Sequence, residues 1–285
     1  MGMEVRIAIA TSDPSGHRSV ELAAQRAYAR IAALDSVLSD WFVGSELRSL
    51  SKSPARGWIP ISPALGQVLA LALNVAHASD GAFDPTVGPL TALWRDARRT
   101  GRPIAETARA VAMKRVGYRF VELDTGHQRV RFLRDSMQVD LGAIAKGWIL
   151  DRALEELRGL GIAAALIEAG GDLTVYGAPP GTLGWRIAIP REQGDTVVVL
   201  THGAVSTSGS GEQSIARADG TRESHVFTPR SGQGLRNGRT ITVVGATAAV
   251  TDALATTLTV VPAKQAASLA ARYRVEVIPR QPFEE

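Results

Sequence analysis

The chain contains no cysteine among its 285 residues, and this absence removes one class of chemistry. Without thiols the protein has neither disulfide bonds nor thiolate metal ligands, so any bound metal ion must rest on oxygen or nitrogen donors. No cysteine near the start can accept a lipid. The missing thiols do not decide the compartment in which the protein works.

Long apolar runs are also absent. No run approaches the roughly 20 residues that span a bilayer, so we expect no transmembrane segment. The opening residues 1–6 begin a strand-like alternation at once and do not resemble a secretory signal. As written, the chain is expected to be soluble and cytoplasmic, without an address signal. A removed leader replaced by a start methionine would leave the same sequence.

Dense basic runs are missing too, although the formal net charge is +4. The arginines are scattered, and no ladder of basic and aromatic residues indicates nucleic-acid binding, so we expect no nucleic-acid partner. Arginine also suits small ligands that carry phosphate. Examples of the scattered arginines are Arg95, Arg98, Arg99, Arg129, Arg131 and Arg134.

What is present is the composition of an ordinary globular protein, with 45% hydrophobic and 21% charged residues. Helix and strand patterns alternate without a regular βαβ rhythm, which indicates an α+β fold with a largely antiparallel sheet packed with helices. No internal repeat, low-complexity tract or proline-rich linker divides the chain. We therefore expect a single domain over residues 1–285, with two closely joined lobes as an alternative.

Hydrophobic periodicity predicts the individual elements. Strands are expected at 5–9, 58–61, 164–167, 173–176, 185–189, 196–200, 240–245 and 275–278, and a hairpin at 116–135. Helices are expected at 19–40, 62–79, 146–160, 250–260 and 263–272. The stretch 95–109 is the most polar connection, and we expect it to be a mobile one.

A first candidate site combines Asp252 and Thr256. Residues four apart share one face of a helix, so this carboxylate and this hydroxyl would point the same way. Such hard oxygen donors suit Mg²⁺, which completes its shell with waters and substrate phosphates. The alternative is that Thr251 and Asp252 only cap the helix.

A second candidate is the segment from Asp140 to Trp148. A carboxylate leads into a glycine-containing turn, and Lys146 and a helix follow. The N–H groups of such a helix start can hold a phosphate, to which the lysine adds a point charge. The spacing of a Walker loop is missing. The alternative is a plain strand-to-helix turn with a capping aspartate and a solvated lysine.

Three further segments are less specific. A rigid loop at 81–90, followed by Trp94, presents Asp84 and Thr86 beside aromatic side chains that suit a planar ring. Glycine-rich or hydroxyl-rich segments at 170–172 and 206–211 let a backbone approach a ligand closely. His225 lies in a loop and could act as a general base, although a lone histidine is more often a structural donor.

In their order and spacing, six motifs resemble the ApbE-type FAD:protein FMN transferases. The likeness begins at Met1-Gly2-Met3 and covers nearly the whole chain, so the set is far more specific than any one motif. The motifs are Gly-Ala-Phe-Asp-Pro-Thr-Val-Gly-Pro-Leu-x-x-Leu-Trp, Val-Asp-Leu-Gly-Ala-Ile-Ala-Lys-Gly-Trp-x-x-Asp, Ala-Gly-Gly-Asp-Leu, Ser-Thr-Ser-Gly-Ser, Ser-His-Val-x-x-Pro-x-x-Gly and Thr-Asp-Ala-Leu-Ala-Thr-Thr-Leu.

This resemblance implies an ApbE-like (T-fold-like) architecture and Mg²⁺-dependent transfer of FMN from FAD to a threonine hydroxyl of an acceptor protein, with release of AMP. It implies that Lys146 and His225 are catalytic, His225 helping to deprotonate the acceptor hydroxyl. The implied metal positions are Ala143 through its carbonyl, Asp252, Ala255 and Thr256. The implied FAD contacts are Met1, Trp41, Ala82, Phe83, Asp84, Asp140, Lys146 and Phe227.

The sequence departs from the family pattern in places. Thr228 stands where the family often has an aspartate, which removes a carboxylate beside the expected base. Many members carry an export signal or a lipoprotein leader, which bears on localisation. Two other functions fit the same residues: a Mg²⁺-dependent FAD pyrophosphatase that gives FMN and AMP, and a flavin-binding protein without turnover.

Overall fold

A six-stranded antiparallel sheet forms the centre of the fold. The computed structural model describes residues 3–12, 17–51, 55–192, 194–209, 213–217, 219–236 and 239–280. In spatial order the strands are β1 (Val5–Ala10), β5 (Ala164–Ala169), β6 (Asp172–Tyr176), β9 (His202–Gly209), β14 (Thr240–Gly245) and β15 (Glu276–Pro279). The predicted antiparallel arrangement is thus confirmed.

Each face of this sheet packs against a different layer. Ala165, Ile167 and Ala204 belong to the main core on the helical face. The opposite face carries Val205 and Val244, which pack against the hairpin of β7 (Trp185–Ile189) and β8 (Thr196–Leu200). Alternation along the strands therefore buries both faces of the central strands.

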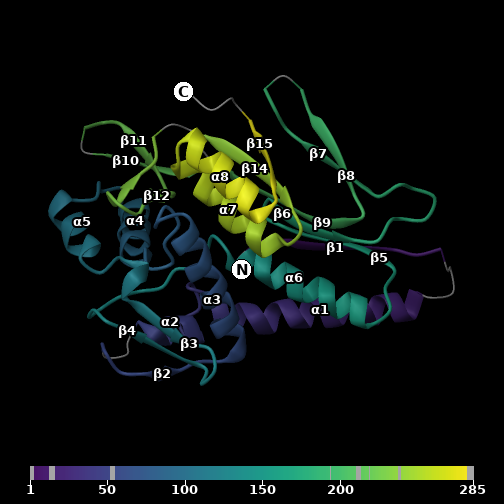
Figure 1. Ribbon diagram of the computed structural model, residues 1–285, viewed down its shortest axis with the longest axis horizontal. Helices are drawn as coiled ribbons and strands as arrows, with labels where there is room; N and C mark the ends of the chain where they lie inside the picture. The colour runs from purple at the N-terminus through teal and green to yellow at the C-terminus, as the bar shows by residue number, and fades with distance from the viewer. Residues whose placement is uncertain are drawn as a thin grey trace.

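The helical layer contains α1 (His17–Leu38), α6 (Ala145–Gly159), α7 (Ala248–Val260) and α8 (Ala263–Tyr273). Figure 1 shows α6 between α1 and α7, with α8 beside α7. The apolar faces of these helices supply buried residues such as Leu34, Ile149 and Leu254 to two adjoining cores. Among the described residues, no helix is long and apolar enough to cross a membrane.

A smaller region packs on the other side of α1. It contains α2 (Glu46–Leu50), α3 (Pro63–Ala78) and a three-stranded sheet of β2 (Ile59–Pro60), β4 (Arg129–Phe132) and β3 (Val121–Asp124). Ser62 caps α3 through a hydrogen bond from the Leu65 N–H, and Pro63 occupies the first turn as predicted. The predicted hairpin at 116–135 is present, but residues 118–120 form a 3₁₀ turn.

The prediction that residues 95–109 form a mobile connection is wrong. The chain there forms α4 (Gly88–Thr100) and α5 (Glu106–Met113), joined after the left-handed residue Gly101. Pro89 stands in the first turn of α4, where the missing N–H of proline breaks no helical hydrogen bond. Gly88 and Pro89 therefore begin the helix, and Gly101 ends it. In α5, buried Arg109 donates to the Glu223 carboxylate at 2.9 Å and fixes the helix in place.

Alongside α4 and α5 lie short strand pairs that the sequence analysis did not predict. These are β10 (Ser214–Ala216) with β11 (Arg222–Ser224), and β12 (Phe227–Thr228) with β13 (Gln233–Gly234). Strands of two or three residues carry too few positions for a period-two pattern. They form a flap that holds the segment with His225.

The crossing of α6 and α7 is unusually close. A Cβ atom at Gly147 would lie 2.1 Å from the carbonyl oxygen of Ala248, so only glycine allows the two backbones to meet. One turn further along α6, the Asp151 carboxylate accepts hydrogen bonds from the N–H groups of Ala248 (2.8 Å) and Ala249 (2.9 Å). Asp151 thus caps α7 from the neighbouring helix.

The titration of Asp151 gives a test of this arrangement. Burial raises its pKa from 3.8 to about 6, although the two N–H donors lower it. Folding then favours the protonated form, so the stability due to this group falls as the pH rises from about 4 to about 6 and is level above. Relative to the wild type, Asp151→Asn should therefore gain on the order of 2 to 3 kcal/mol of unfolding free energy across this window. Urea unfolding at several pH values measures it.

Asp195→Asn, at an exposed position, is the control and should leave the pH dependence of the wild type unchanged. If the stability curves of Asp151→Asn and the wild type run parallel between about pH 4 and pH 6, the raised pKa is contradicted.

Candidate active site

Lys146 lies between two buried carboxylates. Its Nζ atom is 2.9 Å from Asp252 Oδ1 and 3.2 Å from Asp172 Oδ2, and it also donates to the carbonyl oxygen of Gly142 at 3.0 Å. The side chains of Asp172 and Asp252 are 3% and 5% exposed, whereas that of Lys146 is 23% exposed. Two buried negative charges therefore face one lysine, which itself reaches the surface.

The charges of this cluster shift one another's titration. Burial lowers the pKa of Lys146, but the facing carboxylates of Asp252 and Asp172 outweigh burial and hold the pKa above its ordinary value. Burial and the nearby charge of Asp252 raise the pKa of Asp172 to about 7, against the effect of Lys146. One positive charge does not fully compensate two buried carboxylates, so the cluster favours a further cation.

Asp252 does not cap its own helix, so that alternative is wrong. The N-cap of α7 is Thr247, and Asp252 lies further inside the helix. Its Oδ2 atom accepts a hydrogen bond from the N–H of Gly147, in the first turn of α6, at 3.1 Å. Lys146 is likewise not a solvated lysine, because it forms the ion pairs described above. The close α6–α7 crossing thus places both residues.

Hydroxyl groups line the cluster on the side of β9. Thr256 lies one turn after Asp252 on α7, and its hydroxyl donates to the Ser208 hydroxyl at 3.3 Å. Ser206 and Thr251 share a buried hydrogen bond of 2.8 Å between their hydroxyls. The Asp252 carboxylate and the Thr256 hydroxyl therefore have the hydroxyl oxygens of Ser206, Ser208 and Thr251 nearby. Ser210 and Gly211 of the same motif lie outside the described residues.

The turn before α6 is held by Asp140. Its Oδ1 atom accepts from the N–H of Gly142 at 2.8 Å, and its Oδ2 atom accepts from the Thr91 hydroxyl at 2.6 Å. Asp140 therefore ties the turn that contains Ala143 to α4. No side chain caps α6 at Ile144, so a cap by Asp140, the alternative from sequence, is not what the structure has.

The Trp41 side chain is connected to the turn with Asp140 through the neighbouring charged residues Arg95 and Asp40. It is 69% exposed, and the Arg95 guanidinium lies 4.0 Å from the centre of its ring. Arg95 also pairs with Asp40. Burial and the nearby Asp140 raise the pKa of Asp40, while Arg95 lowers it. The exposed ring of Trp41 therefore stands close to the Asp140 side of the site, where it is free to stack on a planar ligand.

Asp84 holds its own loop together through hydrogen bonds, a role that the sequence did not indicate. Its buried carboxylate accepts from the Thr86 N–H (2.8 Å), the Thr86 hydroxyl (2.6 Å) and the Tyr118 N–H (2.9 Å). Burial raises the pKa of Asp84 against these hydrogen bonds. Phe83 is buried in the main core and Ala82 packs beside the second core. The Asp140 N–H donates to the Pro85 carbonyl at 2.8 Å, which joins this loop to the site.

His225 and Phe227 lie on the flap, against a different face of α4. The ring of His225 is 5.9 Å from that of Trp94, and its Nδ1 atom is 3.4 Å from the Gln213 carbonyl oxygen. Phe227 is buried in a third core with Leu90 and Trp94. Trp94 of α4 contacts the His225 ring, and Thr91 of α4 bonds to Asp140 in the turn before Lys146, so α4 relates the two groups.

The structure thus brings Lys146, Asp252 and Thr256 together and joins Asp140 to them through Gly142. Ala255 packs its methyl group into the second core and offers no side-chain oxygen. Met1, expected to contact the flavin, lies outside the described residues. The roles given to all these residues in binding and catalysis remain predictions.

Asp172 is the site residue that the sequence analysis missed. Gly170 and Gly171 both have positive φ angles, 56° and 88°, and form the two-residue turn between β5 and β6. Such a turn requires glycine-like residues, and the residue after it begins the next strand at the end of the sheet. A paired Gly-Gly followed by a carboxylate was the available signal for Asp172.

The donors present fit Mg²⁺. Among the described residues no three histidine, aspartate or glutamate side chains gather into a cage. Magnesium usually needs only one or two carboxylates and takes waters and substrate phosphates for the rest. Asp172 Oδ2 is buried, and its cation, Lys146 at 3.2 Å, is shared with Asp252, so the cluster holds more carboxylates than cations. Asp252, Thr256 and the Ala143 carbonyl would hold the ion.

The cluster thus combines a lysine, buried carboxylates and hydroxyl oxygens, and the exposed ring of Trp41 lies near it. The ApbE family model matches residues 1–279, and the chain belongs to the ApbE family. The predicted family and α+β fold class are therefore confirmed.

Two similar proteins are named FAD:protein FMN transferase. The one from Rhodobacter capsulatus is 33% identical over 249 residues, which are 85% of this chain and 47% of that protein. This chain thus spans about half the length of that relative. The one from Escherichia coli strain K12 is 30% identical over 267 residues, which are 90% of this chain and 75% of that protein. These names agree with the predicted enzyme class.

Solved structures show the same fold. The apo flavinyl transferase ApbE of Pseudomonas stutzeri matches with a TM-score of 0.81 at 26% identity, covering 96% of this chain and 90% of that chain. The ApbE protein of Thermotoga maritima matches with a TM-score of 0.80 at 27% identity, covering 98% and 91%.

Lys146→Met tests the charge balance of the cluster. The substitution keeps the length of the side chain but leaves Asp172 and Asp252 without their cation, so we expect a loss of about 3 kcal/mol in unfolding free energy. Chemical denaturation without added metal measures this loss. The exposed Lys264→Met is the control and should change stability by less than about 0.5 kcal/mol. Equal stability of the two variants would show that Lys146 does not neutralise the cluster.

Proposed function

We propose that this protein transfers the FMN part of FAD to a threonine hydroxyl of an acceptor protein in a Mg²⁺-dependent reaction that releases AMP. Membership of the ApbE family supports flavin transfer as the class of reaction. The observation that carries the finer proposal is the cluster of Lys146 with the buried carboxylates of Asp172 and Asp252. Storage of a flavin needs neither a metal site nor this arrangement of charges.

The residues around the cluster suit attack of a hydroxyl on a pyrophosphate. When bound, Mg²⁺ supplies positive charge to the phosphate oxygens. Lys146 adds a second positive charge and is held in place by Asp172 and Gly142. Asp140 fixes the glycine turn before α6, whose backbone N–H groups can face a phosphate. Trp41 offers an exposed ring on which the isoalloxazine can stack.

His225 is the proposed general base. Its flap packs on Trp94, and its imidazole would take the proton of the acceptor threonine as the bond to phosphorus forms. Thr228 beside it is only partly buried and brings no carboxylate, so His225 would work without a partner acid at that position. The base would then increase the rate without being responsible for all of it.

Mass spectrometry of a threonine-containing acceptor domain tests the proposal directly. After incubation with this protein, FAD and Mg²⁺, we expect the acceptor to gain the mass of FMN while AMP appears, and EDTA to prevent both. AMP and free FMN without modification of a competent acceptor would instead identify a FAD pyrophosphatase. A yellow protein without turnover would identify a flavin binder.

Asp252→Ala and Thr256→Ala test the metal site. Each removes one proposed oxygen ligand, so transfer should fall by at least about a hundredfold. Calorimetric titration with Mg²⁺ in the presence of FAD should show a matching loss of affinity. Thr257→Ala, which removes a hydroxyl of α7 that donates to the Ala253 carbonyl, is the control. Full activity in either site variant would exclude that residue as a ligand.

His225→Gln tests the base. We expect transfer to slow by about 10²- to 10⁴-fold, while the affinity for FAD stays unchanged because the residue acts on the acceptor. The wild-type rate should rise with pH as the imidazole loses its proton, and the variant should lack this rise. An unchanged pH profile in the variant would remove His225 from the mechanism.

A further inference from the structure

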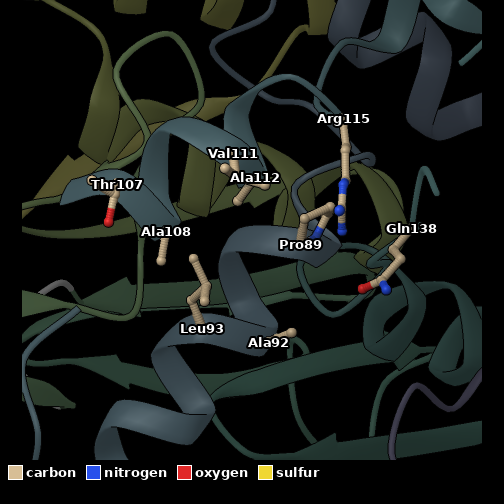
Figure 2. A pocket seen from close by; sticks show the side chains of 9 residues that line it. All are labelled: Pro89, Ala92, Leu93, Thr107, Ala108, Val111, Ala112, Arg115 and Gln138. Atoms are coloured by element: carbon tan, nitrogen blue, oxygen red, sulfur yellow. The ribbon is translucent and has the colours of Figure 1, made fainter. Parts of the chain in front are cut away.

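Two neighbouring hollows lie outside the site described above, one between α4 and α5 and one beyond the C-terminal end of α5. The first, about 460 Å³, lies between α4 and α5 and is lined mainly by apolar side chains (Figure 2). Its lining includes Pro89, Leu93, Ala108, Val111, Ala112 and Gln138. Val111 is 49% exposed, so its apolar side chain is accessible at the edge of this hollow.

The second hollow, about 750 Å³, is basic. Four cationic side chains line it, with Asp135 as the one carboxylate among its lining residues; the cations are Arg56, Lys114, Arg115 and Arg134. Arg134 lies over the ring of Phe120, and among the described residues no ion pair joins any of the four cations to a carboxylate. The hollow therefore attracts negative charge.

The two hollows adjoin each other, because Val111 and Arg115 line both. Figure 2 shows Arg115 near Pro89 and Gln138 at one end of the apolar hollow. A ligand that fills both must cross this ridge and carry apolar groups on one side and negative charge on the other. An extended segment of a protein meets this requirement better than a compact metabolite does.

The same surface adjoins the active site. Thr91 and Arg95 on one face of α4 bond to Asp140 and Asp40, whereas Pro89 and Leu93 on another face line the apolar hollow. Gln138, which also lines it, precedes Asp140 by two residues. A protein held in the two hollows is therefore close to the wall of the site.

We propose that the acceptor protein docks here through an acidic segment that also carries one or two large apolar side chains. The apolar side chains enter the hollow between α4 and α5, and the carboxylates lie over the basic hollow. This inference rests on the proposed function, since it takes a protein as the substrate. It adds a docking surface separate from the pocket for FAD and the reacting threonine.

Steady-state kinetics with the acceptor domain that is competent in the mass-spectrometry assay tests the docking surface. Val111→Glu and Arg115→Glu should each raise the KM for that domain by at least about tenfold, the loss expected for one central contact, while kcat and the Kd for FAD stay as in the wild type. Raising the salt from about 50 to 300 mM should raise the wild-type KM, and less so that of Arg115→Glu. The matched controls are Val197→Glu and Arg186→Glu, at exposed positions on the β7–β8 hairpin.

If the KM of both Val111→Glu and Arg115→Glu stays within twofold of the wild-type KM, the docking proposal is overturned, while the transfer activity stands. If the wild type transfers no FMN at all, the proposed function fails first. Fluorescence anisotropy with a labelled peptide of alternating glutamate and leucine then tests the surface alone. Salt-sensitive binding that Val111→Glu abolishes and Val197→Glu retains supports the surface as a docking site for acidic segments, and absence of binding to the wild type overturns it.

Discussion

The contact between α6 and α7 at Gly147 is the constraint on which the active site depends. Because no side chain separates the two backbones, Asp252 of α7 reaches the N–H of Gly147, and Asp151 of α6 reaches the first N–H groups of α7. Each helix thus satisfies donors at the start of the other, which removes the cost of burying unpaired N–H groups. Lys146, the neighbour of Gly147, is then placed beside Asp252. The same crossing that packs the core also positions the charges.

Those charges are not balanced within the chain. Asp172 and Asp252 come from a strand and a helix far apart in sequence, and Lys146 alone compensates both. Burying unequal charge weakens a fold unless something else supplies the missing charge, and binding of a cation to the folded state restores the balance. The hydroxyls of Thr256 and Ser208 add oxygen donors without adding charge. Under the proposed function, this imbalance lowers the stability of the empty protein and favours the binding of a cation.

The sequence allowed prediction of most of the sheet, of helices α1, α3, α6, α7 and α8, and of the placement of Asp252 and Thr256 on one helix, because strong periodicity and helical spacing are local properties. Residues 88–113 were misjudged since prolines and glycines that usually mark loops here stand at helix starts and ends. Asp172 was overlooked for a different reason. The Gly-Gly turn marks its position at a strand end, but its contact with Lys146 depends on the pairing of β5 with β6, which no local pattern encodes.

Helix α4 shows why local reasoning could not relate the two halves of the site. One face binds Asp140 through Thr91 and Asp40 through Arg95, and so holds the walls around the lysine cluster. A second face packs Trp94 against His225 and the flap. If His225 and Lys146 act on one substrate, as proposed, their separation must be fixed, and α4 contacts both the flap and the turn before Lys146. Its sequence specifies an amphipathic helix, whereas its place in the site comes from the two different surfaces against which that helix is packed.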